Sequence, residues 1–225
     1  RNARKFKNLK IKAISVHIGS QITSVGPYRK TLNILYKIIR SSKINFEYVD
    51  LGGGFGIPYQ NKEKKINIGN YSRLVKKFQK KLNCKIIFEP GRFITGNAGA
   101  LISKILFIKQ NGKKYFIIID AGMNDFMRPA LYNAMHNIIP VSKSKKRIGG
   151  NVEFVGPICE STDTFLKYKN FAFLNENDLV AITNVGAYGS ALSSNYNTKP
   201  LASEIIVKNG KIKIARRRQK ISEII

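Results

Sequence analysis

The first half of the chain alternates between short β-prone runs and longer amphipathic runs, and this alternation limits the fold more than any other feature. The segments 12–17, 46–51 and 85–88 are rich in β-branched and aromatic residues, as buried strands are. Between them, 28–41 and 71–82 place apolar residues at helical spacing. Because parallel strands need crossover connections, this order predicts parallel βαβ units.

The second half has a different texture, in which β-prone runs are separated by Gly, Asn and Asp turns. Asn209-Gly210 is typical of a type I′ hairpin turn. One short helix is expected over 129–137, and a polar loop is expected in the first half over 60–65. The predicted strands are 100–109, 114–120, 152–157, 178–184, 204–208 and 211–215. We therefore predict two domains, residues 1–95 of α/β type and residues 96–225 of mainly antiparallel β type.

The chain is strongly basic, with 40 Lys and Arg against 13 Asp and Glu and a net charge of +27. Such a charge would suggest nucleic-acid binding, but the basic residues are spread along the chain and the runs 143–147 and 216–218 are short. We interpret the charge as a solvated surface and expect no nucleic-acid partner. The apolar runs are too short to cross a membrane, and the two cysteines suggest neither a disulfide framework nor a metal site. A cytoplasmic location is the simplest expectation.

Polar and glycine residues follow each strand of the first half. Gly52-Gly53-Gly54 offers unhindered backbone amides of the kind that hold phosphate groups. His17 and Ser20 follow the first strand, and Glu89-Pro90-Gly91-Arg92 follows the third as a tight turn. Because parallel strands end at the same edge, these groups are expected to converge. Glu89 could then hold a cationic ring while Arg92 holds an anion; the alternative is an ordinary turn with a surface ion pair.

Three further motifs lie in the β-rich half, namely Arg128–Tyr132, Cys159-Glu160 and the run GAYGSALSSNYN at 186–197. Together with HIGSQ at 17–21, the glycine run and Glu89–Arg92, in this order, they resemble the fold-type III pyridoxal-phosphate decarboxylases. The resemblance covers essentially the whole chain and involves several independent motifs.

This resemblance implies pyridoxal 5'-phosphate as the cofactor and a fold made of the last βα units of a (β/α)8 barrel followed by a β-rich domain. Glu89 would pair with the pyridine nitrogen, His17 would stack on the ring, and Cys159 would be the catalytic proton donor. The full set implied to bind the cofactor is His17, Ser20, Gly53, Gly54, Glu89, Pro90, Gly91, Arg92 and Tyr188.

The resemblance also implies an amino-acid substrate. Arg92, Arg128 and Tyr132 suit a carboxylate at the far end of the substrate, and Glu160 suits an ammonium group. Tyr188 also belongs to the implied substrate-binding set. These features favour decarboxylation of meso-2,6-diaminopimelate to L-lysine. An ornithine- or arginine-type decarboxylase is an alternative, although an arginine pair would repel a purely cationic far end. A non-catalytic homologue or fragment that binds a decarboxylase is a second alternative.

Two departures from the family pattern stand out. The family's Ser-Gly-Asp is here Ser161-Thr162-Asp163, and no lysine matches the motif of the Schiff-base lysine, which lies upstream in the family. We therefore expect this chain to be the C-terminal portion of a longer enzyme. The resemblance further implies a head-to-tail homodimer with shared active sites, in which Cys159 and Glu160 serve the partner's cofactor.

Overall fold

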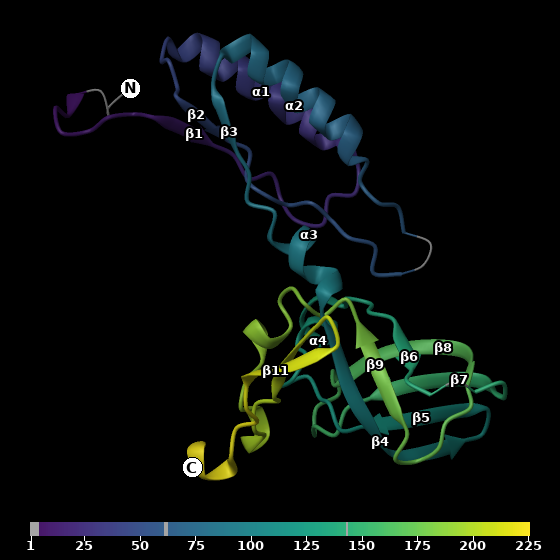
Figure 1. Ribbon diagram of the computed structural model, residues 1–225. Coiled ribbons are helices and arrows are strands. Elements are labelled where there is room, and N and C mark those ends of the chain that lie inside the picture. The colour runs from purple at the N-terminus through teal and green to yellow at the C-terminus, as the bar shows by residue number, and fades with distance from the viewer. Residues whose placement is uncertain (1–4, 61–62, 143) are drawn as a thin grey trace. The chain divides into compact units, whose positions relative to one another are not determined.

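The computed structural model describes residues 5–60, 63–142 and 144–225. The chain forms two compact units, residues 1–96 (the N-terminal unit) and residues 97–225 (the C-terminal unit), and Figure 1 labels most of their helices and strands. The sequence places the boundary after residue 95. Residues 61–62 of the predicted loop over 60–65 and residue 143 of the basic run lie outside the described residues.

The N-terminal unit contains a parallel three-stranded sheet in the order β1-β2-β3. Its strands are β1 (Ala13–Ser15), β2 (Tyr48–Asp50) and β3 (Lys85–Ile87), connected by the helices α1 (Val25–Ser42) and α2 (Ile68–Leu82). The register pairs Ile14 with Val49 and Val49 with Ile86. The predicted βαβ order is confirmed, although each strand is shorter than the sequence suggests.

Both helices lie along the same face of this sheet (Figure 1). The apolar stripe of α1 buries Leu32, Leu35 and Ile39, and the stripe of α2 buries Val75 and Phe78 in the same core cluster. The 3.6-residue period of each helix turns these side chains toward the strands. Helix α1 begins at Val25 rather than 28, because Pro27 fits the first turn, where a missing N–H leaves no helical bond unmade.

No helix among the described residues of the N-terminal unit covers the opposite face of the sheet. Strand side chains alternate between the two faces, and Val49 faces the helices while Ala13, Ser15 and Ile87 lie on the other side. Ile87 keeps 41% of its surface exposed. No helix among the described residues combines the length and apolar composition needed to cross a membrane.

The C-terminal unit is built on a six-stranded sheet in the order β6-β9-β4-β5-β7-β8. The strands are β4 (Ala100–Asn111), β5 (Lys114–Ile119), β6 (Ile138–Pro140), β7 (Arg147–Val155), β8 (Thr164–Ala172) and β9 (Leu179–Thr183). Every neighbouring pair is antiparallel except β5 and β7, which are parallel, so the sheet is mixed. Ile105, Ile117, Phe154 and Ile182 form its fully buried centre.

The sequence analysis missed two strands of this unit and made one helix too long. Strands β6 and β8 were not predicted, because β6 has only three residues and the bulges along the β7–β8 pair interrupt the alternation of apolar residues. The helix predicted over 129–137 is α4 (Arg128–Tyr132), which is much shorter. Asn133 ends it in the left-handed conformation with φ of 50°, and the chain then turns into β6.

The strands β10 (Glu204–Lys208) and β11 (Lys211–Arg216) form the predicted hairpin. Asn209 and Gly210 have φ of 50° and 74°, as a type I′ turn requires at both central residues, so the hairpin prediction is confirmed. The remaining short elements are α3 (Gly91–Thr95), η2 (Gly96–Ala98), η3 (Ser190–Leu192), η4 (Tyr196–Thr198) and η5 (Ile221–Glu223).

Candidate active site

The carboxyl ends of β1, β2 and β3 bring together the polar groups of the N-terminal unit. The Gly53 amide lies 3.4 Å from His17 Nδ1, and the Glu89 amide donates to the Gly52 carbonyl at 2.9 Å. His17, Ser20 and Glu89 are all solvent-exposed. The expected convergence of the three strand ends therefore exists, because the parallel register places them at one edge.

The glycine run allows this convergence through very close backbone approach. A Cβ on Gly53 would lie 2.0 Å from the Glu89 carbonyl oxygen, and a Cβ on Gly54 would lie 2.2 Å from the Gly19 carbonyl oxygen. Gly54 also has φ of +85°, a conformation that side chains strongly disfavour. Any residue other than glycine at these two positions would therefore push away the neighbouring backbone.

Two residues that the sequence analysis did not assign hold the glycine run in place. Asp50 accepts a hydrogen bond from the Gly52 amide at 2.8 Å, and the Tyr28 hydroxyl donates to the Gly53 carbonyl at 3.2 Å. Burial raises the pKa of Tyr28 to about 12, so its hydroxyl stays protonated as a donor. The role of Asp50 could have been predicted from its position just before the glycines. The role of Tyr28 could not, because in the sequence Tyr28 is only one apolar position of a predicted helix.

Arg92 contacts two hydroxyl groups. Its Nη2 donates to Ser20 Oγ at 3.0 Å and its Nη1 donates to the hydroxyl of Tyr59, whose ring centre lies 5.7 Å from the guanidinium carbon. Arg92 thus lies beside Ser20, a predicted phosphate ligand. The sequence analysis did not identify the second partner, Tyr59, which is buried. The predicted tight turn is also corrected, because Gly91 and Arg92 begin the helix α3.

The N-terminal unit provides groups that fit pyridoxal phosphate. One edge presents an exposed carboxylate at Glu89, an imidazole at His17, a hydroxyl at Ser20 and a cation at Arg92. Open space adjoins the backbone here, since a Cβ at Gly19 or Gly91 would meet no atom within 4 Å. An aromatic ring with a protonated nitrogen and a phosphate needs this combination of partners.

The second group of predicted residues lies in the C-terminal unit around Arg128. Arg128 is 7% exposed, and its guanidinium carbon lies 5.8 Å from the ring centre of Tyr132 and 5.9 Å from that of Tyr188. Its Nε donates to Nε2 of His136 at 3.2 Å. The structure thus brings Arg128, Tyr132 and Tyr188 together, as a substrate-binding cluster requires.

Tyr188 adopts a backbone conformation that few non-glycine residues accept, with φ of 58°. The glycines around it permit this local backbone path. A Cβ on Gly189 would lie 2.3 Å from the Val185 carbonyl oxygen, and a Cβ on Gly99 would lie 2.7 Å from Gly186. Strained residues of this kind concentrate at ligand sites, so the conformation supports a functional assignment of Tyr188.

Cys159 and Glu160 lie on an exposed loop, residues 156–163, that is organised by a buried aspartate. Asp163 is 3% exposed and accepts hydrogen bonds from the amides of Met123 at 2.7 Å and Ile158 at 2.8 Å. A Cβ on Gly156 would lie 2.2 Å from its carboxylate. Burial raises the pKa of Asp163, and the two amide bonds offset this effect only in part.

Thr162, which replaces the glycine of the family pattern, contacts Glu160 directly. Both its amide and its hydroxyl donate to Glu160 Oε1 at 3.2 Å. The hydroxyl also lies 3.9 Å from Met123 Sδ. The departure at position 162 therefore adds one side-chain donor that orients the Glu160 carboxylate.

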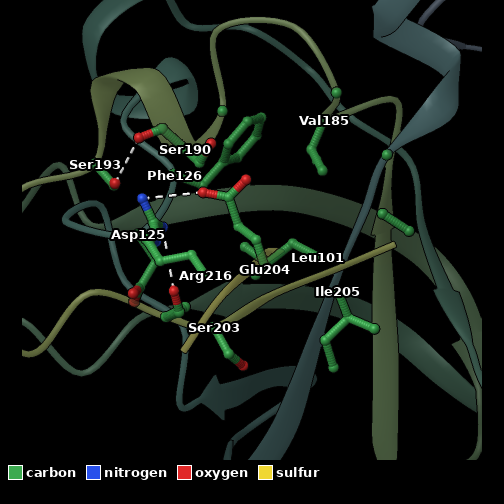
Figure 2. A pocket seen from close by; sticks show the side chains of 15 residues that line it. Leu101, Asp125, Phe126, Val185, Ser190, Ser193, Ser203, Glu204, Ile205 and Arg216 are labelled. Atoms are coloured by element: carbon green, nitrogen blue, oxygen red, sulfur yellow. Dashed lines mark hydrogen bonds and ion pairs between the residues drawn. The ribbon is translucent and has the colours of Figure 1, made fainter. Parts of the chain in front are cut away.

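A cavity of about 230 Å³ lies in the C-terminal unit and is shown in Figure 2. Arg216 crosses it, paired with Glu204 at 2.9 Å and donating to the Ala202 carbonyl at 3.1 Å. Phe126, which lines this cavity, also packs edge-on against His136, with ring centres 4.6 Å apart. None of the predicted site residues lines the cavity, and its wall at 186–190 instead supports the loop that carries Tyr188.

Replacing Asp163 with asparagine should lower the free energy of unfolding by about 1–3 kcal/mol, because an amide has one acceptor oxygen for two buried N–H donors. Chemical denaturation of the two proteins measures this difference. Asp178→Asn is a matched control, since Asp178 accepts one bond, from the Asn175 amide at 2.8 Å, that an amide oxygen can keep. Equal effects at the two positions would contradict the role assigned to Asp163.

Comparisons with known proteins identify relatives among pyridoxal-dependent decarboxylases. Residues 18–186 match a family described as pyridoxal-dependent decarboxylase, C-terminal sheet domain. Diaminopimelate decarboxylase of Aquifex aeolicus is 41% identical over 99% of this chain, which covers 54% of that protein. The enzyme of the same name from Zymomonas mobilis is 38% identical over 97% of this chain and 52% of its own length.

A solved structure, diaminopimelate decarboxylase from Helicobacter pylori complexed with L-lysine, superimposes with a TM-score of 0.91. It is 37% identical, and the match covers 99% of this chain and 55% of that one. The chain thus spans about half the length of the curated relatives it matches. Because the family match extends over most of its length, the chain belongs to the pyridoxal-dependent decarboxylase family.

Proposed function

We propose that this chain forms the C-terminal half of a diaminopimelate decarboxylase, which removes CO₂ from meso-2,6-diaminopimelate and releases L-lysine. The observation that carries the proposal is the buried Arg128 flanked by Tyr132 and Tyr188. The relatives of that name, which match almost the entire chain, support it further.

The cofactor in this proposal is pyridoxal 5'-phosphate, held by the N-terminal unit. Glu89 would pair with the pyridine nitrogen and His17 would stack on the ring. When bound, the cofactor accepts the electron pair left behind as CO₂ departs. The phosphate would be held by Ser20, Gly53, Gly54, Gly91 and Arg92, with the Tyr188 hydroxyl. The contact between Arg92 and Ser20 supports a place for Arg92 beside the phosphate, from which its guanidinium would also reach toward the far carboxylate of the substrate.

The far end of the substrate carries a carboxylate and an ammonium group. Arg128 would bind the carboxylate with its planar guanidinium, and Tyr132 would close the site beside it. Glu160, oriented by Thr162, would accept the ammonium group. Ornithine and arginine lack the second carboxylate, so the Arg128 guanidinium would have no carboxylate to bind and would oppose their cationic ends, which Glu160 alone would not offset.

Cys159 would deliver the proton that replaces CO₂. Its exposed position on the loop held by Asp163 supports this role, because the thiol remains accessible while its backbone is fixed. We further propose a head-to-tail homodimer in which Cys159 and Glu160 of one subunit serve the cofactor of the other.

We also propose that the N-terminal unit is part of a (β/α)8 barrel. One face of its three-stranded parallel sheet is covered by helices, and the other is uncovered among the described residues. Isolated parallel sheets with one bare face are rare, whereas barrel strands meet side chains of other strands on that face. Ile87, exposed on the bare face, would then become buried.

The experiment that tests this function is an assay of the full-length protein containing this chain, loaded with pyridoxal phosphate. We expect CO₂ and L-lysine from meso-2,6-diaminopimelate, and a kcat/KM for ornithine and arginine at least about 100-fold lower, as loss of a buried charge pair implies. Faster turnover of ornithine would replace the substrate assignment. Binding of the cofactor without turnover of any of these substrates would favour the non-catalytic alternative.

A further inference from the structure

His136 is buried behind Arg128 and is 2% exposed. Its Nδ1 lies 3.0 Å from the Thr183 carbonyl oxygen, while its Nε2 accepts the hydrogen bond from Arg128 Nε at 3.2 Å. Phe126 packs edge-on against the ring and fixes its plane. It is one of two histidines in the chain and has no role in the function proposed above.

The hydrogen bonds determine the protonation state of this ring. A carbonyl oxygen can only accept, so Nδ1 must carry the hydrogen that Thr183 receives. An arginine Nε can only donate, so Nε2 must offer its lone pair. The imidazole is therefore neutral, with its Nδ1–H directed to the Thr183 carbonyl and its Nε2 lone pair to Arg128 Nε.

The fold brings His136 to this place through a sharp reversal. Helix α4 ends after Tyr132, and Asn133 adopts a left-handed conformation that turns the chain back. The Ala134 amide then donates to the Arg128 carbonyl at 3.4 Å, and β6 pairs with β9 beyond it. The side chain of His136 thus joins Arg128 to Thr183, the last residue of β9 in the six-stranded sheet.

We propose that His136 is a positioning residue that fixes the Arg128 guanidinium for the far carboxylate of the substrate. The inference rests on the proposed function. A guanidinium bound through Nε keeps its plane and presents its two Nη groups on the opposite side, which is the geometry for a bidentate carboxylate contact. The imidazole bond removes the freedom of the arginine side chain to turn away from that geometry.

Two substitutions separate the nitrogens of His136. His136→Asn places an amide near the position of Nδ1 and leaves Arg128 Nε without its acceptor. His136→Gln reaches the position of Nε2 and can restore that acceptor through its oxygen. In the full-length enzyme we expect His136→Asn to raise the KM for diaminopimelate about tenfold with little change in kcat, and His136→Gln to recover most of the loss.

Two amines, tested as competitive inhibitors, give a pair of binding affinities whose ratio a general loss of stability would not change. L-lysine carries the far carboxylate and 1,5-diaminopentane does not. Calorimetry on the holoenzyme should show about tenfold weaker binding of L-lysine to His136→Asn and unchanged binding of the diamine. If the asparagine variant does not fold, His136→Met provides a substitute of similar volume without a nitrogen.

Tyr168→Phe is a matched control for the loss of a buried hydrogen bond. The Tyr168 hydroxyl accepts from the Ile138 amide at 2.7 Å, two residues from His136. This variant should unfold more easily while its KM and inhibitor affinities stay as in the wild type. Unchanged L-lysine affinity in His136→Asn, or equal losses for both inhibitors, would overturn the inference. Absence of diaminopimelate turnover in the wild type would instead overturn the proposed function, and the inhibitor comparison would still decide the role of His136.

Discussion

Replacing Arg128 with alanine should reduce kcat/KM for diaminopimelate about 100-fold or more, mainly through a higher KM. Arg128 is buried and its guanidinium carbon lies 5.8 Å and 5.9 Å from the ring centres of Tyr132 and Tyr188, where a charge pair with a carboxylate is screened little by water. Truncation of one partner of such a pair costs about 2–5 kcal/mol of binding free energy. Steady-state kinetics of the full-length enzyme at saturating cofactor measures the change.

The controls for this substitution distinguish charge from geometry. Arg128→Lys keeps the charge but loses the planar fork, so we expect an intermediate KM. Arg147→Ala removes an exposed arginine whose Nη1 donates to the Asn170 carbonyl at 3.3 Å, and it should leave the KM unaltered. A KM for Arg128→Ala equal to that of the wild type would remove the basis for the substrate assignment.

Replacing Gly53 with alanine should abolish cofactor binding and lower the free energy of unfolding by about 3 kcal/mol or more. The added Cβ would lie 2.0 Å from the Glu89 carbonyl oxygen, which is backbone and cannot move aside alone. The strand ends carrying the glycine run and Glu89 would therefore separate. Cofactor absorbance and chemical denaturation of the full-length protein measure the two effects.

Gly26→Ala is the matched control for this substitution. Gly26 lies in the first turn of α1, and a Cβ there would meet nothing within 4 Å. Alanine should be neutral or slightly stabilising at this position, because it restricts the unfolded chain. Retention of cofactor by Gly53→Ala would mean that the predicted phosphate site is not where the glycine run lies.

The regular elements of the N-terminal unit could be predicted because local signals and tertiary structure agree there. The helical spacing of apolar residues in α1 and α2 matches the faces that they bury. In the C-terminal unit, the Asn209-Gly210 turn was equally clear. Strand β8 was missed because its pairing with β7 contains bulges, and each shift of register breaks the alternation of inward and outward residues along the strand.

The candidate site shows the same division. Motif residues such as Glu89 and Arg128 were identifiable because their chemistry is visible at the level of residue type. Their supports were not, since Asp163 and His136 act through partners 40 and 8 residues away in sequence. Whether a polar side chain is buried against such a partner depends on the folded chain, and no local pattern records it.

The sequence alone determined the order of strands and helices in the N-terminal unit, the glycine run after β2, and the motifs that resemble those of pyridoxal-dependent decarboxylases. Only the tertiary structure decided that Arg128 is held by His136, that Glu160 is oriented by Thr162, and that Asp163 fixes the Cys159 loop. The physical reason is that periodicity and turn chemistry can be read from residue types in order, whereas hydrogen-bond geometry and burial depend on the three-dimensional path of the chain, even between residues as near in sequence as Glu160 and Thr162.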